Sequence, residues 1–197
     1  MTARTTDPRV LPAIADRWSP RSFDGSAVPA EDLAVILEAA SLAPSAYNQQ
    51  PWRFLYAVRG DANWDHFVSL LVPGNAVWAK DAGALLFAVS ETTFPRPDGA
   101  KPNRSHSFDA GSAWALLALQ ATHMGYHAHA MVGMEFPRVR QELAIPEDFH
   151  INAAIVIGRK DAPEKLPDGY REREAPSGRK PVSAFAVGGK FTDLPAD

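Results

Sequence analysis

A polar segment enclosed by two prolines constrains this chain more than any other feature. Ahead of it, residues 34–40 (AVILEAA) have the pattern of an amphipathic helix, and Pro44 disfavours helical backbone in the residue before it. After Pro51, residues 52–58 (WRFLYAV) are aromatic and β-branched enough for a strand. The loop between them, residues 45–50 (SAYNQQ), carries hydroxyl and amide groups without charge. Such a loop suits the edge of a flat, polar, uncharged ligand, and a stiff polar connection is the alternative.

Length and composition exclude several classes of function. The 197 residues predict a single domain, residues 1–197, in which residues 160–197 form a charged, proline-rich C-terminal extension. A net charge of −3 with scattered basic residues argues against nucleic-acid binding. No cysteine is present, so disulfides and thiolate chemistry are excluded and redox chemistry would need a bound cofactor. Without a signal-peptide core or a membrane-length apolar run, we expect a cytoplasmic protein with no membrane association.

Apolar patterns, prolines and glycines predict the remaining elements. A short helix is expected to begin at Asp7 and Pro8, and a second helix spans about residues 29–42. The continuous apolar run at 82–89 predicts a strand covered on both faces. Further helices are expected at 64–71, ended by Pro73-Gly74, at 108–124 and at 137–143; strands are expected at 128–132 and 152–158, and a long loop at 92–107.

The helix predicted at 108–124 is apolar around nearly its whole circumference. A helix of this kind must be buried on all sides. One domain of this size covers such a helix poorly, so we expect part of it to lie in a subunit interface.

Two arginines near the N-terminus are candidates for an anion site. The first helix must end near Ser19-Pro20, which leaves Arg17, Ser19 and Arg21 on an extended loop. Alternate residues of extended backbone project to one side, so the two guanidinium groups would flank a hydroxyl group. This arrangement suits a phosphate. Ordinary surface arginines are the alternative.

Three histidines, His123, His127 and His129, raise the possibility of a metal site. Gly125 interrupts them, and no nearby carboxylate completes a metal-binding motif. We therefore expect no metal, and a position near a helix C-terminus explains the histidines more simply.

The sequence resembles a known enzyme family in two motifs. The segments RWSPRSF (17–23) and APSAYNQQPW (43–52) resemble the N-terminal motif pair of the nitroreductase family of FMN-dependent oxidoreductases. A weaker resemblance continues through residues 109–113, Gly133 and residues 178–181. It implies an α+β fold, with helices around a mainly antiparallel sheet, in an intertwined homodimer.

The resemblance also implies which residues hold FMN. Arg17, Ser19 and Arg21 match the motif that grips the FMN phosphate and reaches toward the flavin, and Arg179 matches a C-terminal phosphate-binding arginine. Ser177 stands where relatives often have a basic residue. Val132 and Gly133 align with the segment whose backbone amides face flavin N5, and a glycine allows close backbone approach to a ligand. The other expected contacts are Trp18, the loop residues Pro44, Ser45, Ala46 and Asn48, which would reach a flavin held mainly by the other subunit, and Asn75, for which a turn asparagine is the alternative.

The expected function follows from this resemblance. We expect an oxidoreductase that passes hydride from NADH or NADPH, through FMN, to a small-molecule acceptor such as a nitroaromatic or a quinone, by a ping-pong mechanism. Because the flavin carries the chemistry, no side chain is expected to be catalytic. A flavin-binding storage or sensor protein is one alternative, and a relative that acts as a dehalogenase or on flavin itself is another.

Overall fold

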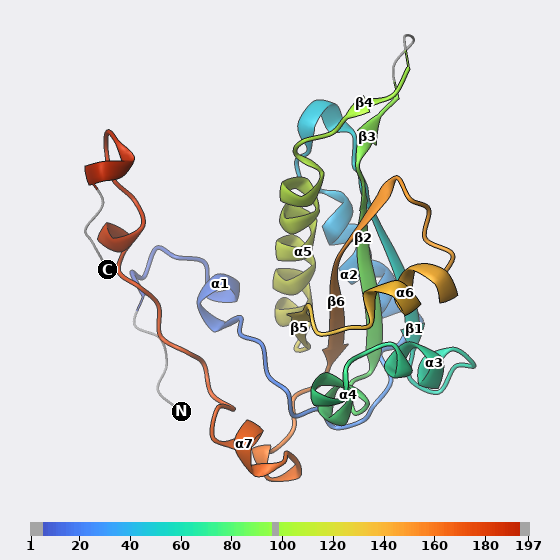
Figure 1. Cartoon of the computed structure of the whole chain (residues 1–197). Coiled ribbons are helices and arrows are strands. Elements are labelled where there is room, and N and C mark those ends of the chain that lie inside the picture. Colours follow the sequence, from blue (N-terminus) through green and yellow to red (C-terminus); the bar gives the residue numbers. More distant parts are fainter. Residues whose placement is uncertain (1–5, 96–98, 194–197) are drawn as a thin grey trace.

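The protein, described by a computed structural model over residues 6–95 and 99–193, has helices on both faces of a sheet (Figure 1). Four antiparallel strands pair in the order β1-β2-β6-β5. Helices α2 and α5 pack on one face of this sheet, and α3, α4 and α6 pack on the other. The elements are β1 (Trp52–Val58), β2 (Ala84–Glu91), β5 (His127–Met131), β6 (Phe149–Gly158), α2 (Ala30–Ser41), α3 (Trp64–Ser69), α4 (Pro73–Ala79), α5 (His106–His123) and α6 (Phe136–Glu142). The predicted α+β fold with an antiparallel sheet is confirmed.

Strand β2 is central, and its sequence explains why. Residues 84–90 are all buried, as the continuous apolar run predicted. Leu85 and Phe87 face the cluster built with α3, α4 and α6, whereas Ala84 and Leu86 face the cluster built with α2 and α5. Alternate residues of one strand therefore fill the core on both sides of the sheet.

Proline explains two of the helix boundaries that differ from the prediction. Helix α1 spans Pro12–Asp16 rather than beginning at Pro8, and residues 8–10 form a turn. A helix that began at Pro8 would place the ring of Pro12 against the carbonyl of residue 8, and Pro12 has no N–H to donate there. Pro73 does not end a helix but begins one, because it occupies the first turn of α4, where a missing N–H costs nothing.

The stretch predicted as a loop at 92–107 contains regular structure. Strands β3 (Thr93–Phe94) and β4 (Lys101–Pro102) pair antiparallel beyond the end of β2, at the top of Figure 1. Residues 96–98 lie outside the described part. Helix α5 then begins at His106, two residues before the predicted start.

Helix α5 is not buried on all sides within this chain, and the expectation that a subunit interface covers part of it stays a prediction. Its buried face carries Ala110, Ala113, Leu117 and Ala121, which pack against α2 and the sheet. Elsewhere on the helix, Leu116 and Leu119 lie beside α1, whereas Gly111, Ala115 and Phe108, which is 80% exposed, face outward.

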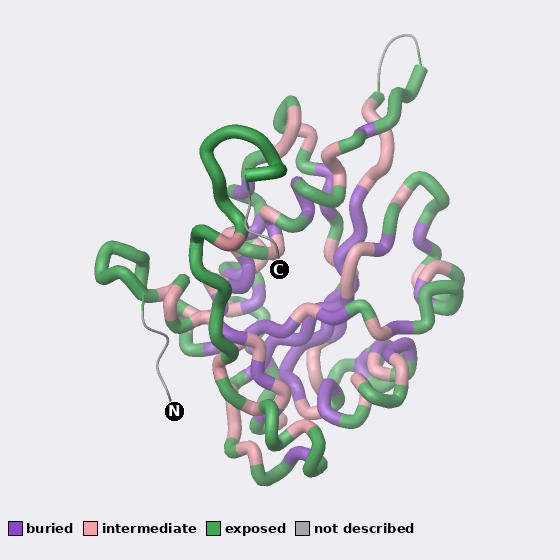
Figure 2. The backbone as a smooth tube through the Cα atoms, turned by 60° about the vertical axis from the view of Figure 1, so that its left-hand side comes forward, coloured by how far each residue is buried: buried purple, intermediate pink, exposed green. Residues whose placement is uncertain are grey.

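The C-terminal extension crosses the bottom of the molecule and then leaves the sheet (Figure 1). It contains only short elements: the 3-10 helices η2 (Pro163–Lys165), η3 (Val182–Ala184) and η4 (Phe191–Asp193), and the helix α7 (Asp168–Arg171). Figure 2 shows long exposed stretches in this part of the chain. Its apolar side chains are largely exposed, with Phe191 at 87%. Among the described residues, no helix is both long and apolar enough to cross a membrane.

Candidate functional site

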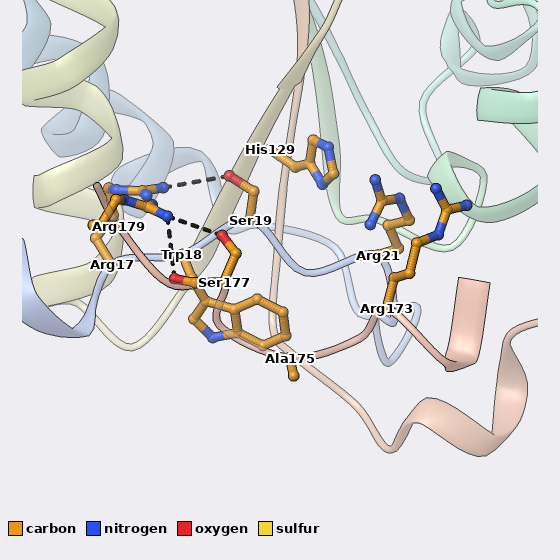
Figure 3. Close-up of a pocket in the computed structure, with 9 residues that line it drawn as sticks. All are labelled: Arg17, Trp18, Ser19, Arg21, His129, Arg173, Ala175, Ser177 and Arg179. Carbon is orange, nitrogen blue, oxygen red and sulfur yellow. Dashed lines mark hydrogen bonds between the residues drawn. The ribbon is translucent and has the colours of Figure 1, made fainter. Parts of the chain in front are cut away.

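A pocket of about 290 Å³ lies where the loop after α1, strand β5 and the C-terminal extension meet (Figure 3). The loop contributes four of the residues predicted from the sequence, and the extension contributes Arg179. The full lining is Arg17, Trp18, Ser19, Arg21, His129, Arg173, Ala175, Ser177 and Arg179. Five predicted site residues thus border one cavity, although Arg179 is more than 150 positions from the other four in the sequence.

Arginine dominates the chemistry of this pocket. Four guanidinium groups line it, and none of its nine lining residues is acidic. In Figure 3 the side chains of Arg17 and Arg179 lie at one end of the pocket, and those of Arg21 and Arg173 lie at the other. Guanidinium groups supply several charged N–H donors each, so this lining favours a ligand with a phosphate or another anionic group.

The serines of the pocket hold two of these arginines in place. Arg17 Nη1 donates to Ser19 Oγ at 3.3 Å. Arg179 Nη1 lies 2.9 Å from Ser177 Oγ and 3.1 Å from the Ser177 carbonyl oxygen, to which it donates. Ser177 therefore belongs to the pocket as a partner of Arg179.

His129 forms part of the pocket wall and is buried. Its Nδ1 lies 2.9 Å from the carbonyl oxygen of Pro20, and because that oxygen can only accept, Nδ1 carries the proton. The ring packs at 4.7 Å from Trp78 between ring centroids. Burial lowers the pKa of His129, and the positive charge of Arg21 lowers it further. The histidine therefore stays neutral and links the loop to β5.

The expected explanation for the histidines is wrong for two of them. Only His123 lies in the last turn of a helix, whereas His127 and His129 are in β5. Being two positions apart, the two histidines lie on the same face of the strand: the ring of His127 packs T-shaped against Trp18, with 6.2 Å between ring centroids, and His129 borders the pocket that Trp18 also lines. A strand rather than a helix end positions them.

Asn75 contacts Gly133 and lies in a helix, so the alternative of an asparagine in a loop turn is wrong. Asn75 lies in the first turn of α4, and its Nδ2 donates to the carbonyl oxygen of Gly133 at 3.0 Å. A β-carbon on residue 133 would come within 2.4 Å of that same Nδ2. A side chain at position 133 would therefore displace the Asn75 amide, while the neighbouring Val132 is 67% exposed.

The polar loop at 44–50 does not join the pocket of its own chain. It contains the 3-10 helix η1 (Ala46–Asn48) and lies at the N-terminal end of α5, at the opposite end of the molecule from the pocket (Figure 1). The backbone N–H of Ala46 donates to Asp109 Oδ2 at 3.2 Å, and Ser45 Oγ accepts from the N–H of Gln50 at 2.9 Å.

Backbone strain marks this loop as specialised. Tyr47, Asn48 and Gln50 all have φ between 50° and 54°, a left-handed conformation that is unfavourable for residues with a side chain. Strain of this kind persists only where the surroundings enforce it, and it is concentrated at functional sites. Pro44 and Asn48 are exposed, so the loop presents its polar groups outward.

Sequence reasoning missed two charged or titratable members of the pocket, Arg173 and His129. Arg173 lies in a charged tail where no short pattern distinguishes it from exposed arginines. The alternation of His127 and His129 with alanines was a usable signal for His129, because alternate residues of a strand lie on one face, so both histidines lie opposite Ala128 and Ala130.

The fold and the pocket define a three-layer α+β protein with an arginine-lined pocket assembled from both ends of its chain. Residues 14–159 match the nitroreductase family, and the chain belongs to that family. Residues 173–179 of the pocket lie beyond the matched segment.

Three relatives show how far the similarity extends. A solved structure of an oxidoreductase containing FMN is 48% identical, with a TM-score of 0.93, over 95% of this chain and 96% of the other. Protein DrgA of Synechocystis sp. is 27% identical over 78% of this chain and 86% of its own length. MhqN of Bacillus subtilis, named as a candidate NAD(P)H nitroreductase, is 25% identical over 87% of this chain and 95% of its own length.

Proposed function

We propose that this protein is an FMN-dependent oxidoreductase. The observation that carries the proposal is the pocket lined by four arginines at a position formed by the two ends of the chain. A phosphate-bearing cofactor fits this donor set, because guanidinium and hydroxyl groups together bind a phosphate by several charge-assisted hydrogen bonds. The relative that is 48% identical over nearly the whole chain contains FMN.

Different residues of the pocket would bind the phosphate and the flavin ring of the cofactor. Arg17, Ser19 and Arg179 would hold the phosphate, with Ser177 orienting Arg179. Arg21, whose guanidinium carbon lies 5.8 Å from the ring centroid of Trp78, would face the flavin and stabilise negative charge near N1 and the C2 carbonyl. When bound, FMN would supply the hydride chemistry, accepting hydride from NADH or NADPH and passing it to a nitroaromatic, quinone or similar acceptor.

A second subunit would complete the site. We propose a homodimer in which Pro44, Ser45, Ala46 and Asn48 reach the flavin of the partner, because this strained polar loop lies far from the pocket of its own chain. A groove of about 300 Å³ between α1, α2 and α5 supports a subunit interface on this side. Its apolar lining includes Leu11, Ile14, Leu42, Leu116 and Leu119, and Leu42 is 76% exposed. Val132 and Gly133, with Asn75 behind them, would border the flavin ring from the first subunit.

The identity of the cofactor tests the proposal directly. We expect the purified protein to be yellow and to release FMN, not FAD or riboflavin, on denaturation, as measured by absorbance and chromatography of the released flavin. Addition of NADH or NADPH without oxygen should then bleach the flavin absorbance. Protein that binds no flavin after incubation with excess FMN would contradict the assignment, and bound flavin that neither nucleotide bleaches would favour a storage or sensor role.

The order of substrate binding provides a second test. If NAD(P)H and the acceptor occupy the same position over the ring in turn, they cannot be bound together. Steady-state rates with a quinone or nitroaromatic acceptor should therefore give parallel double-reciprocal lines, the ping-pong pattern. Intersecting lines would show that both substrates bind at once and would refute the shared position.

A further inference from the structure

One carboxylate ties the C-terminal extension to the loop that carries Arg17 and Arg21. Glu174 Oε1 accepts hydrogen bonds from the backbone N–H groups of Arg21, at 2.8 Å, and of Ser22, at 2.9 Å. These contacts join residues 153 and 152 positions apart in the chain. Hydrogen bonds to a carboxylate are stronger than those between neutral groups, so one side chain holds two distant segments together.

The start of the extension is anchored to the same loop by other contacts. Ser22 Oγ donates to the carbonyl oxygen of Ala162 at 2.5 Å, and the N–H of Asp161 donates to the carbonyl oxygen of Ser22 at 3.0 Å. Glu174 adds a second attachment further along, after the chain has passed through α7. The extension therefore leaves and returns to a single short stretch of the loop.

Glu174 lies where it can fix the relative positions of residues that line the pocket. Its neighbours Arg173 and Ala175 line the cavity, as does Arg21, whose N–H it binds. Figure 3 shows the side chains of Arg21 and Arg173 at the same end of the pocket. Hydrogen bonds weaken when donor and acceptor move a few tenths of an ångström apart, so the spacing of guanidinium groups on the two segments decides how well one anion satisfies them.

We propose that Glu174 is a positioning residue for phosphate recognition. By binding the N–H groups of residues 21 and 22, it sets the arginines of the extension, Arg173 and Arg179, against those of the loop. This inference rests on the proposed FMN site. Glu174 acts through the two segments that it joins and does not itself bind the phosphate.

The charge of Glu174 and its positioning role predict opposite changes in FMN affinity when the carboxylate is removed. A negative charge beside the pocket repels a phosphate, so removing the charge alone should tighten FMN binding. Releasing the extension should instead weaken FMN binding, because the arginines would no longer converge. Weaker binding after removal of a negative charge would therefore identify the positioning role.

The experiment compares FMN with riboflavin, which lacks the phosphate, by titration of flavin-free protein. Glu174→Ala should weaken FMN binding roughly tenfold and riboflavin binding by a smaller factor, since the loss of two hydrogen bonds to a charged group releases the extension that carries Arg179, and riboflavin has no phosphate for Arg179 to bind. Glu174→Gln keeps an acceptor oxygen and should stay within about threefold of the parent. Glu174→Asp keeps the charge but shortens the side chain, so it should behave like the alanine variant.

Two controls complete the design. Glu172→Ala removes a negative charge from the same segment, at an exposed side chain, and should not reduce the preference for FMN over riboflavin. Thermal unfolding of each flavin-free variant shows whether the variant is folded, so that released contacts of the extension are distinguished from unfolding of the whole protein. If the alanine variant does not fold, Glu174→Asp is used in its place.

The outcomes distinguish this inference from the proposed function. If the parent protein binds riboflavin as tightly as FMN, the phosphate site itself is wrong. If the parent prefers FMN and the folded Glu174→Asp and Glu174→Ala variants keep that preference, the phosphate site stands and the positioning role is overturned.

Discussion

Replacement of Arg17 and Arg179 together by alanine should weaken FMN binding by roughly a hundred- to ten-thousandfold. A hydrogen bond to a charged group contributes about 1.5–3 kcal/mol, which corresponds to a ten- to hundredfold change for each single variant. The two effects should add if the two side chains bind the phosphate independently. Fluorescence titration of flavin-free protein with FMN measures both single variants and the double variant.

Riboflavin and a remote arginine provide the controls for this prediction. Binding of riboflavin should change little in the same variants, because the ring contacts remain. Arg9→Ala removes an exposed guanidinium that pairs with Asp7, and it should leave FMN affinity unchanged. Parent-like FMN affinity in both single variants would show that the phosphate binds elsewhere.

Substitution of Leu42 by arginine should separate the subunits and empty the flavin site. Leu42 caps the C-terminal end of α2, is 76% exposed in the single chain and lies two residues before the loop proposed to reach the partner. Its exposure means that the charge costs the isolated subunit little. Within an interface, however, an unpaired buried charge costs about 3–5 kcal/mol, which raises the dimer dissociation constant more than a hundredfold.

The measurement combines sedimentation over a range of protein concentrations with the flavin content of each fraction. Because the proposed site needs both subunits, FMN binding should fall together with dimer formation. Val77→Arg is a matched control, since Val77 is 39% exposed on α4, across the sheet from α2. A Leu42→Arg protein that stays dimeric, or a monomer that binds FMN as tightly as the parent, would contradict the two-subunit site.

The elements whose signals are local were predicted well. Helix α2 and strands β1, β2 and β6 follow from apolar patterns, because residues of one helix face or one strand face recur at fixed short spacings. The start of α1 was missed although the sequence contained the signal, since Pro12 forbids a helix that begins at Pro8. For the exposed side of α5, an apolar circumference indicates burial without saying what covers it, so the subunit interface expected there stays a prediction.

What the sequence alone determined about this protein is its helices and strands, its family resemblance and five of the nine residues around the pocket. Only the tertiary structure decided that Arg173, His129 and Glu174 belong with them, and that the loop at 44–50 lies at the far end of the molecule. The physical reason is the separation along the sequence between the residues that interact. A helix or strand is encoded by neighbours a few residues apart, whereas the pocket depends on contacts such as Glu174 to Arg21, across 153 positions, which form only when the whole chain packs.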